Sequence, residues 1–196
     1  NYGLAYAYEK YIYKGIITFP NRDSWKIWNE PLNARNATNF ASNGWDNLCV
    51  VANINNTTYL SSSPVFSSDP ISFLCTGGDC FYNGAIDPDL DDLSYSLTPP
   101  KTNQANNANM SYQGGASYLQ PFPGSTTTCD PITGDLCINT NLPGTSVTAI
   151  KVTESRNGTN IGFVTRDIQI WTRACTAAAT TIAATAGSGT TFNSSL

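Results

Sequence analysis

The chain has 196 residues, with 10 Lys+Arg against 14 Asp+Glu, no histidine and only 12% charged residues, about half the fraction typical of soluble domains. A net charge of -4 without a cluster of Lys or Arg argues against nucleic acid and anionic membranes as partners, and the absence of histidine excludes Ser-His-Asp catalysis, Cys-His catalysis and most zinc sites. Abundant Asn, Ser and Thr supply the solubility instead, as is typical of an extracellular surface. We therefore expect an extracellular or cell-surface protein that is not an enzyme.

With 40% hydrophobic residues, the chain can bury one sizeable core, and no apolar run is long enough to predict a membrane span. We expect an N-terminal segment at 1–19, a β-rich globular domain at 20–175 and a C-terminal tail at 176–196 that is rich in Ala, Thr, Ser and Gly. The first residues lack the basic and apolar regions of a signal peptide, so we expect a mature form whose leader has been removed.

Residues 1–19 are rich in tyrosine, and their pattern fits two conformations. With a period of two, one face of a strand carries Tyr2, Leu4, Tyr6 and Tyr8. With a period of 3.6, a helical stripe contains Leu4, Tyr8, Tyr11 and Ile12. The tyrosine-rich composition favours the strand, and an extended or helical segment is predicted.

The run Trp28-Asn29-Glu30-Pro31 resembles the Asn-Glu-Pro signature of the large (β/α)8 glycoside hydrolase clan. That resemblance implies that Glu30 is a general acid/base in a barrel of about 250 residues, with three strands before the motif. Only 27 residues precede Trp28, and a retaining enzyme needs a second carboxylate about 5 Å away. We interpret the match as a coincidence, and a small secreted glycoside hydrolase remains the weakest alternative.

Trp25, Trp28 and Trp45 are candidates for a sugar-binding platform, because aromatic faces stack on sugar rings while nearby Asn and Asp side chains bind hydroxyl groups. The alternative is that these tryptophans belong to the core, as most do.

The cysteines are even in number, and they lie at Cys49, Cys75, Cys80, Cys129, Cys137 and Cys175. They favour disulfides and an oxidising compartment over buried thiols or a metal site, because no Cys-x-x-Cys pair and no histidine completes a metal ligand set. Six cysteines allow 15 pairings. Intervening Gly and Pro-Gly turns favour the local loops Cys75–Cys80 and Cys129–Cys137, which leaves Cys49 with Cys175.

The pattern in the middle of the chain predicts short strands between Ser and Pro turns, at 48–54, 57–60, 65–66 and 71–74. Residues 98–116 contain Pro99-Pro100 and a run of Asn, Gln and Ala, which predicts a long surface loop. These segments indicate a mainly β fold, an antiparallel β-sandwich-like domain with disulfide-stapled loops.

The clearest element is a hairpin late in the chain. Residues 145–154 and 160–172 are β-rich and flank Asn157-Gly158, the strongest short-range hairpin signal. In the second strand Val164, Ile168 and Ile170 share one parity, which predicts a face turned to the core. Cys175 would then staple the end of that strand.

An acidic run, Asp87-Pro88-Asp89-Leu90-Asp91-Asp92, places carboxylates at alternating positions, as the start of a calcium loop does. An EF-hand is excluded, because Asp92 and Thr98 stand where that loop needs Gly and Glu. Two interpretations stay open: a structural calcium site at Asp87, Asp89 and Asp91, or an acidic turn in solvent. We expect no other cofactor.

Asn-x-Ser/Thr sequons occur at Asn36, Asn55, Asn56, Asn109, Asn157 and Asn193. Their number is close to what chance would give in so Asn-, Ser- and Thr-rich a chain. Glycosylation is nevertheless compatible with the low charge, since glycans would help to solvate such a surface.

Residues 1–19 and 176–196 resemble segments of prokaryotic surface-filament subunits, the pilin-like and donor-strand-linked families. In donor-strand assemblies an N-terminal extension completes the sheet of the next subunit, so the resemblance implies that the inserted side chains are Tyr2, Leu4, Tyr6 and Tyr8. The chain lacks the long apolar N-terminal helix of type IV pilins. We expect a structural subunit of a filament whose partners are copies of itself; the alternative is a carbohydrate-binding or host-attachment (adhesin) module.

Overall fold

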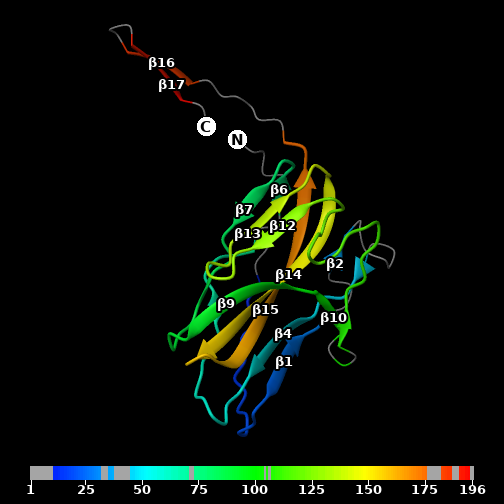
Figure 1. Cartoon of the computed structure of the whole chain (residues 1–196), viewed down its shortest axis with the longest axis vertical. Coiled ribbons are helices and arrows are strands. Elements are labelled where there is room, and N and C mark those ends of the chain that lie inside the picture. Colours follow the sequence, from blue (N-terminus) through cyan, green and yellow to red (C-terminus); the bar gives the residue numbers. More distant parts are fainter. Residues whose placement is uncertain are drawn as a thin grey trace.

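The computed structural model describes residues 11–31, 35–37, 45–70, 73–103, 105, 107–175, 182–186 and 190–194. All regular elements in these ranges are β-strands, and all their pairings are antiparallel except that of β6 with β15 (Figure 1). The expectation of a mainly β protein with antiparallel sheets is confirmed. A helical N-terminal segment is not supported, since residues 11–22 form neither helix nor strand, and residues 1–10 lie outside the described part.

The main sheet contains six strands. Across the sheet they run in the order β1 (Trp25–Asn29), β4 (Val50–Ile54), β15 (Thr159–Arg173), β14 (Gly144–Arg156) and β9 (Asp92–Thr98), and β6 (Phe73–Cys75) pairs with the end of β15. The two longest strands, β14 and β15, thus lie at the centre, with β1 at one edge (Figure 1).

The hairpin of β14 and β15 is the one that the sequence predicts, with slightly longer strands. Asn157 and Gly158 form its turn with φ values of 52° and 76°. Positive φ at both central residues is what a type I′ turn requires, and Asn-Gly supplies it at low cost.

One face of the main sheet packs against a three-stranded sheet of β12 (Thr126–Cys129), β13 (Leu136–Asn139) and β7 (Asp79–Phe81). Side chains from both sheets, together with Phe122 from the segment before β12, form the main core: Leu74, Tyr95, Phe122, Leu136, Ile138, Ile150, Val152, Ile168 and Ile170. Val164 packs against this cluster. The core face predicted from the parity of residues 164, 168 and 170 is therefore confirmed.

The opposite face of β14 carries a smaller cluster of Ala37, Val147 and Met110, with Tyr112 packed against it. The Tyr112 hydroxyl donates a hydrogen bond of 2.7 Å to the Val147 carbonyl. The prediction of a surface loop over 98–116 is therefore wrong in part. Its few apolar side chains cover a sheet face, and it contains the hairpin of β10 (Lys101–Asn103) and β11 (Ala108–Asn109).

Three further two-stranded pairs complete the described elements: β2 (Arg35–Asn36) with β3 (Trp45–Asp46), β5 (Val65–Phe66) with β8 (Ala85–Ile86), and β16 (Ile182–Ala186) with β17 (Thr190–Ser194). The strands expected near 48–54, 65–66 and 71–74 are present as β4, β5 and β6. Residues 57–60 form no strand, because the Asn55 side chain accepts hydrogen bonds from the backbone N–H groups of Thr57 and Thr58 and turns the chain.

No helix in the described ranges is long and apolar enough to cross a membrane.

Two disulfides join Cys75 to Cys175 and Cys80 to Cys137, across 100 and 57 residues. The predicted pairings Cys75–Cys80, Cys129–Cys137 and Cys49–Cys175 are therefore wrong, and the disulfide assignment of Cys49 and Cys129 is corrected, since both are free. Strand pairing is the reason, because β6 runs parallel to the end of β15, and the register of β13 with β7 places Cys137 opposite Cys80. Two disulfides are typical of an oxidising, extracellular-type compartment.

Candidate functional site

The acidic run folds into a tight loop after β8. The Asp87 Oδ1 atom accepts hydrogen bonds from the backbone N–H groups of Asp89 at 2.8 Å and Asp91 at 3.2 Å. Leu90 closes the loop in the left-handed region, with φ of 64°. Because the chain wraps around the Asp87 carboxylate, that side chain is buried, with 5% of its surface exposed.

This loop brings Asp87 and Asp91 to the buried Glu154 of β14. One carboxylate oxygen from each of the three residues lies within 4.8 Å of the others, and we call this group the acidic cluster. Asp89, which the sequence suggested as a ligand, is not part of it: its Oδ2 accepts a hydrogen bond of 2.5 Å from the Ser62 backbone N–H. Of the three residues suggested by the sequence, the structure thus groups Asp87 and Asp91 with Glu154 and places Asp89 outside this group.

A β-bulge positions Glu154. It pairs with Gly162 of β15, and the register shifts immediately after it, between Glu154 and Ser155. A Cβ atom at Gly162 would lie 2.8 Å from the Asn53 carbonyl oxygen and 3.3 Å from Glu154 Oε2. The absence of a side chain at this position therefore allows β4, β15 and the Glu154 carboxylate to approach closely.

The electrostatics of the acidic cluster push its carboxyl groups in opposite directions. Burial, the largest cause, together with the nearby Asp87 and Asp91 carboxylates raises the pKa of Glu154 to about 7, against a lowering by the Ser61 hydrogen bond. The Arg156 guanidinium donates to both Asp91 oxygens, at 2.5 and 2.6 Å, and holds the pKa of Asp91 below its ordinary value. The cluster therefore contains one charge-balanced carboxylate and two that lack a cationic partner among the described contacts.

Paired carboxylates are also the machinery of glycoside hydrolases, but these are inaccessible to a sugar. Glu154 is 3% exposed and Asp87 is 5% exposed. The Asn-Glu-Pro glutamate lies elsewhere, where Glu30 accepts a hydrogen bond of 2.8 Å from the Asn103 amide. Because the described residues form no helix, the (β/α)8 barrel implied by that motif is excluded for them.

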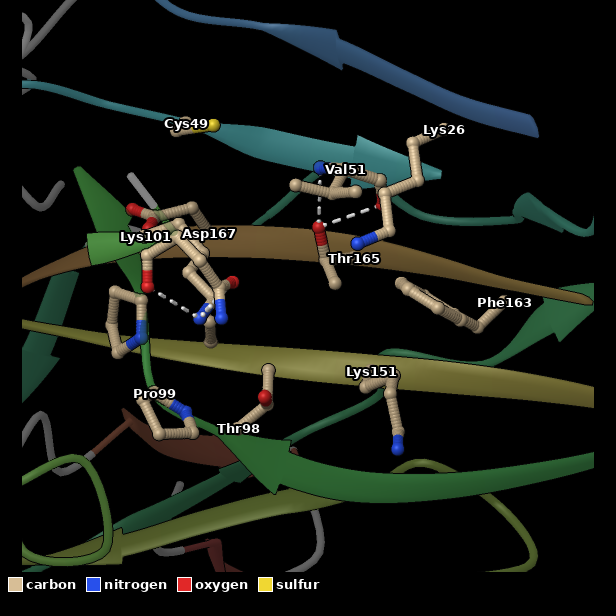
Figure 2. A pocket seen from close by; sticks show the side chains of 13 residues that line it. Lys26, Cys49, Val51, Thr98, Pro99, Lys101, Lys151, Phe163, Thr165 and Asp167 are labelled. Atoms are coloured by element: carbon tan, nitrogen blue, oxygen red, sulfur yellow. Dashed lines mark hydrogen bonds between the residues drawn. The ribbon is translucent and has the colours of Figure 1, made fainter. Parts of the chain in front are cut away.

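A second feature is a pocket of about 180 Å³ on the other face of the main sheet, where β4 and β15 separate. Figure 2 shows Thr165 of β15 reaching toward Val51 of β4. The Thr165 hydroxyl accepts from the Val51 N–H at 2.8 Å and donates to the Val51 carbonyl at 3.0 Å. The Thr165 side chain thus takes the place of backbone hydrogen bonds between β15 and β4. The pocket lies where this backbone pairing has ended.

The pocket walls are mainly apolar, and three lysines line them, Lys26, Lys101 and Lys151. Lys26 belongs to β1 and Lys151 to β14 (Figure 2), and the Lys151 ammonium lies 6.0 Å from the centre of the Phe163 ring. At the other end lies the buried ion pair of Arg35 and Asp167, with a 2.6 Å contact.

The two free cysteines are poor nucleophiles. Burial raises the pKa of the Cys49 thiol, which lines the pocket. Burial, together with Asp130 and Asp135, raises the pKa of Cys129 to about 11. Both thiols are therefore protonated at neutral pH, and the thiolate is the reactive form.

The three tryptophans do not form one platform. Trp25 and Trp28 are three residues apart on β1, so they project to opposite faces. Trp25 is structural: its ring stacks on Phe19 at 5.1 Å and its indole N–H donates to the Pro20 carbonyl at 2.9 Å. Trp28 is 53% exposed, and Trp45 lies in β3.

The N-terminal segment displays large apolar side chains to solvent. Five of them are at least two-thirds exposed: Tyr11 70%, Ile12 68%, Tyr13 85%, Ile16 101% and Ile17 69%. The segment joins the body where Phe19 and Arg22 contact the Trp25 ring. The predicted subunit contacts Tyr2, Leu4, Tyr6 and Tyr8 lie outside the described residues.

The sequons differ in how accessible their side chains are. Asn36, Asn109 and Asn157 are exposed. The Asn56 amide is occupied, because it donates to the Pro20 carbonyl and accepts from the Arg22 backbone N–H. Asn55 turns the chain as described above, and Asn193 lies in β17.

Comparison with known proteins adds no relative: no protein-family model matches the chain, and neither the curated proteins nor the solved structures contain a significant match.

Proposed function

We propose that this protein is an extracellular structural subunit of a filament or pilus-like surface assembly, in which the N-terminal segment of one copy packs on the next. The observation that carries the proposal is the run of five exposed apolar side chains between Tyr11 and Ile17. Isolated exposed apolar residues are ordinary, but a contiguous apolar stretch marks an interaction surface. The domain serves in this proposal as a sandwich-like body without a catalytic role.

The fold offers an acceptor for such a segment at the edge of the main sheet. Among the described residues, β1 pairs only with β4. As far as the described residues go, the other edge of β1 carries backbone groups that an added strand could pair with, and peptide segments commonly bind sheets in this way. We propose that the N-terminal segment of a second copy adds to β1.

Such a contact joins two different surfaces, the segment of one copy and the sheet edge of the next. A head-to-tail contact of this kind does not close on itself in general, so it generates an open filament. The low charge of the chain, 12% charged residues, supports this proposal, since surfaces covered by neighbouring subunits have less need of charge for solubility. Glycans on exposed sequons such as Asn157 would serve the same purpose.

The test is assembly of the full chain compared with a chain that lacks residues 1–17. This truncation leaves Phe19 and its contact with Trp25 in place, so the body should fold. Negative-stain microscopy should show filaments from the full chain, and sedimentation should show monomers from the truncated one. A synthetic peptide of residues 1–17 should bind the truncated chain with one-to-one stoichiometry, whereas a scrambled peptide should not.

A matched pair of substitutions tests the apolar contact itself. Ile12→Ser with Ile16→Ser should abolish assembly. Leu60→Ser with Ile132→Ser, at positions 89% and 80% exposed, removes comparable apolar surface elsewhere and should leave assembly intact. Filaments that form from the truncated chain would refute the proposal.

A carbohydrate-binding or adhesin module is the second candidate, favoured by the 53% exposure of Trp28 on β1. Under this alternative, a glycan array should detect binding that Trp28→Ala abolishes. Phe66→Ala, which removes an aromatic ring on the core side of the main sheet, should retain it. An array without any signal would leave the filament subunit as the proposal.

A further inference from the structure

The acidic cluster contains a buried oxygen atom that nothing in the described protein satisfies. Asp87 Oδ2 has no hydrogen-bond partner, although its residue is only 5% exposed. The other oxygen of the same carboxylate accepts two backbone N–H groups. A carboxylate oxygen buried without a partner is costly, and buried charges are normally paired or coordinate a metal. The unpartnered oxygen therefore indicates that a cation belongs in the cluster.

We propose that Asp87, Asp91 and Glu154 bind one calcium ion. Their ligand oxygens lie within 4.8 Å of one another, so all three lie at most about 2.8 Å from a common centre, close to the calcium–oxygen distances of about 2.3–2.6 Å. A small inward movement of the side chains lets one ion contact all three. The Ser61 hydroxyl hydrogen-bonds to both Asp91 and Glu154 and supplies a fourth oxygen at the edge of the cluster.

The charges of the cluster match a divalent ion. When all three carboxylates are ionised, as calcium binding requires, the Arg156 guanidinium paired with Asp91 leaves two negative charges uncompensated. Arg156 occupies one direction on each Asp91 oxygen and Ser61 a second direction on Oδ2, so among the described contacts Asp91 Oδ1 keeps a second lone pair for a metal. A calcium ion would therefore neutralise the cluster without displacing Arg156.

The ligand chemistry selects calcium among common metals. Oxygen is the only donor element in the cluster, so the site lacks the nitrogen and sulfur ligands that zinc and copper prefer. Magnesium demands near-ideal octahedral geometry at about 2.0–2.1 Å. A loop, a strand end and a serine side chain form a less regular set, which the flexible coordination of calcium accommodates.

The ion would tie together parts of the chain that are far apart in sequence. It would fasten the 87–91 loop and the neighbouring Ser61 to the bulged end of β14. Its role is structural, because the ligands are buried and no substrate can reach them. This inference is independent of the proposed filament function, since the residues of the cluster lie outside the N-terminal segment and outside β1.

Calorimetric titration of the metal-free full chain with CaCl2 tests the site. We expect one ion per chain with a Kd of about 0.1–1 mM, the range of extracellular calcium modules. Calcium at ten times Kd should raise Tm by about 3–6 °C, and magnesium should bind at least tenfold more weakly. No calcium binding by the full chain would overturn the proposal.

Three substitutions locate the ion. Asp87→Asn and Glu154→Gln each remove one ligand charge with little change of shape and should weaken calcium binding at least tenfold. Asp92→Asn removes the same charge from an exposed neighbour of the cluster and should bind calcium as the unmodified chain does. Unchanged affinity in Asp87→Asn would show that the ion binds elsewhere, which would also overturn the proposal.

A measurement on the unmodified chain keeps the test decisive if a variant fails to fold. Backbone amide NMR shifts recorded during the calcium titration should change most for residues 87–91 and 154. Saturable changes centred on another part of the chain, or no saturable change, would refute the assignment.

Discussion

Removal of the Cys75–Cys175 disulfide should destabilise the protein by about 4.7 kcal/mol. The bridge closes a loop of 100 residues, and closing a loop of that length removes about this much conformational free energy from the unfolded chain. The Cys80–Cys137 bridge closes 57 residues, which gives about 4.2 kcal/mol by the same relation. Either loss is a large part of the roughly 5–15 kcal/mol that stabilises a typical domain.

Urea unfolding of alanine variants measures these losses and tests the pairing at once. Cys75→Ala and Cys175→Ala should each break the same bridge, so the double variant should be little less stable than either single variant. Cys75→Ala and Cys80→Ala break different bridges, so their effects should approximately add. Cys129→Ala removes a free thiol and should change stability far less.

The opposite pattern would refute the reasoning. If Cys75 were paired with Cys80, the two single variants and their double variant would have one common stability. The loss would then be only ~2 kcal/mol, the value for so short a loop. Non-reducing peptide mapping gives the same answer directly, because a peptide that joins residue 75 to residue 175 exists only with the pairing described here.

Three further predictions concern the main sheet. In the absence of calcium, stability should fall as the pH rises from about 5 to 8, because burial raises the pKa of Glu154 from 4.5 to about 7 and the folded state therefore favours its protonated form. Glu154→Gln should flatten this part of the Tm–pH curve, and an unchanged slope would contradict the assignment. Arg35→Met should cost about 3–5 kcal/mol in urea unfolding, because it leaves the buried Asp167 carboxylate without its ion-pair partner; a loss below about 1 kcal/mol would be inconsistent with that pair. Thr165→Val should cost about 1–3 kcal/mol, because the near-isosteric side chain leaves both polar groups of Val51 without their bridge, and a variant as stable as the parent would show that water replaces the hydroxyl.

The late hairpin was predictable because its information is local. Asn157-Gly158 satisfies the backbone requirement of one turn type, and alternation at residues 164, 168 and 170 identifies the buried face. The acidic loop was partly predictable for the same reason, since alternating carboxylates at 87, 89 and 91 mark a turn. Its third ligand was not predictable: Glu154 reaches the loop through the pairing of β14 with β9, about sixty residues away in sequence.

The disulfide pairing was missed because local turn chemistry does not decide it. Gly77 and Gly78 do form a turn with positive φ, as the short Cys75–Cys80 loop would need. However, β6 and β7, which flank this turn, belong to different sheets. Each cysteine therefore meets a partner from the strand beside it, and those partners are set by long-range strand order that a single sequence does not reveal.

The long disulfide also determines how the protein would respond to a pulling force. Tension applied between the N-terminal segment and the region after Cys175 passes through the covalent bond from Cys75 to Cys175. The 100 residues between these cysteines then cannot extend. At about 3.4 Å per residue, the protein therefore extends by about 340 Å less than it would without the disulfide. Under such a load, only the residues outside the 75–175 loop could lengthen.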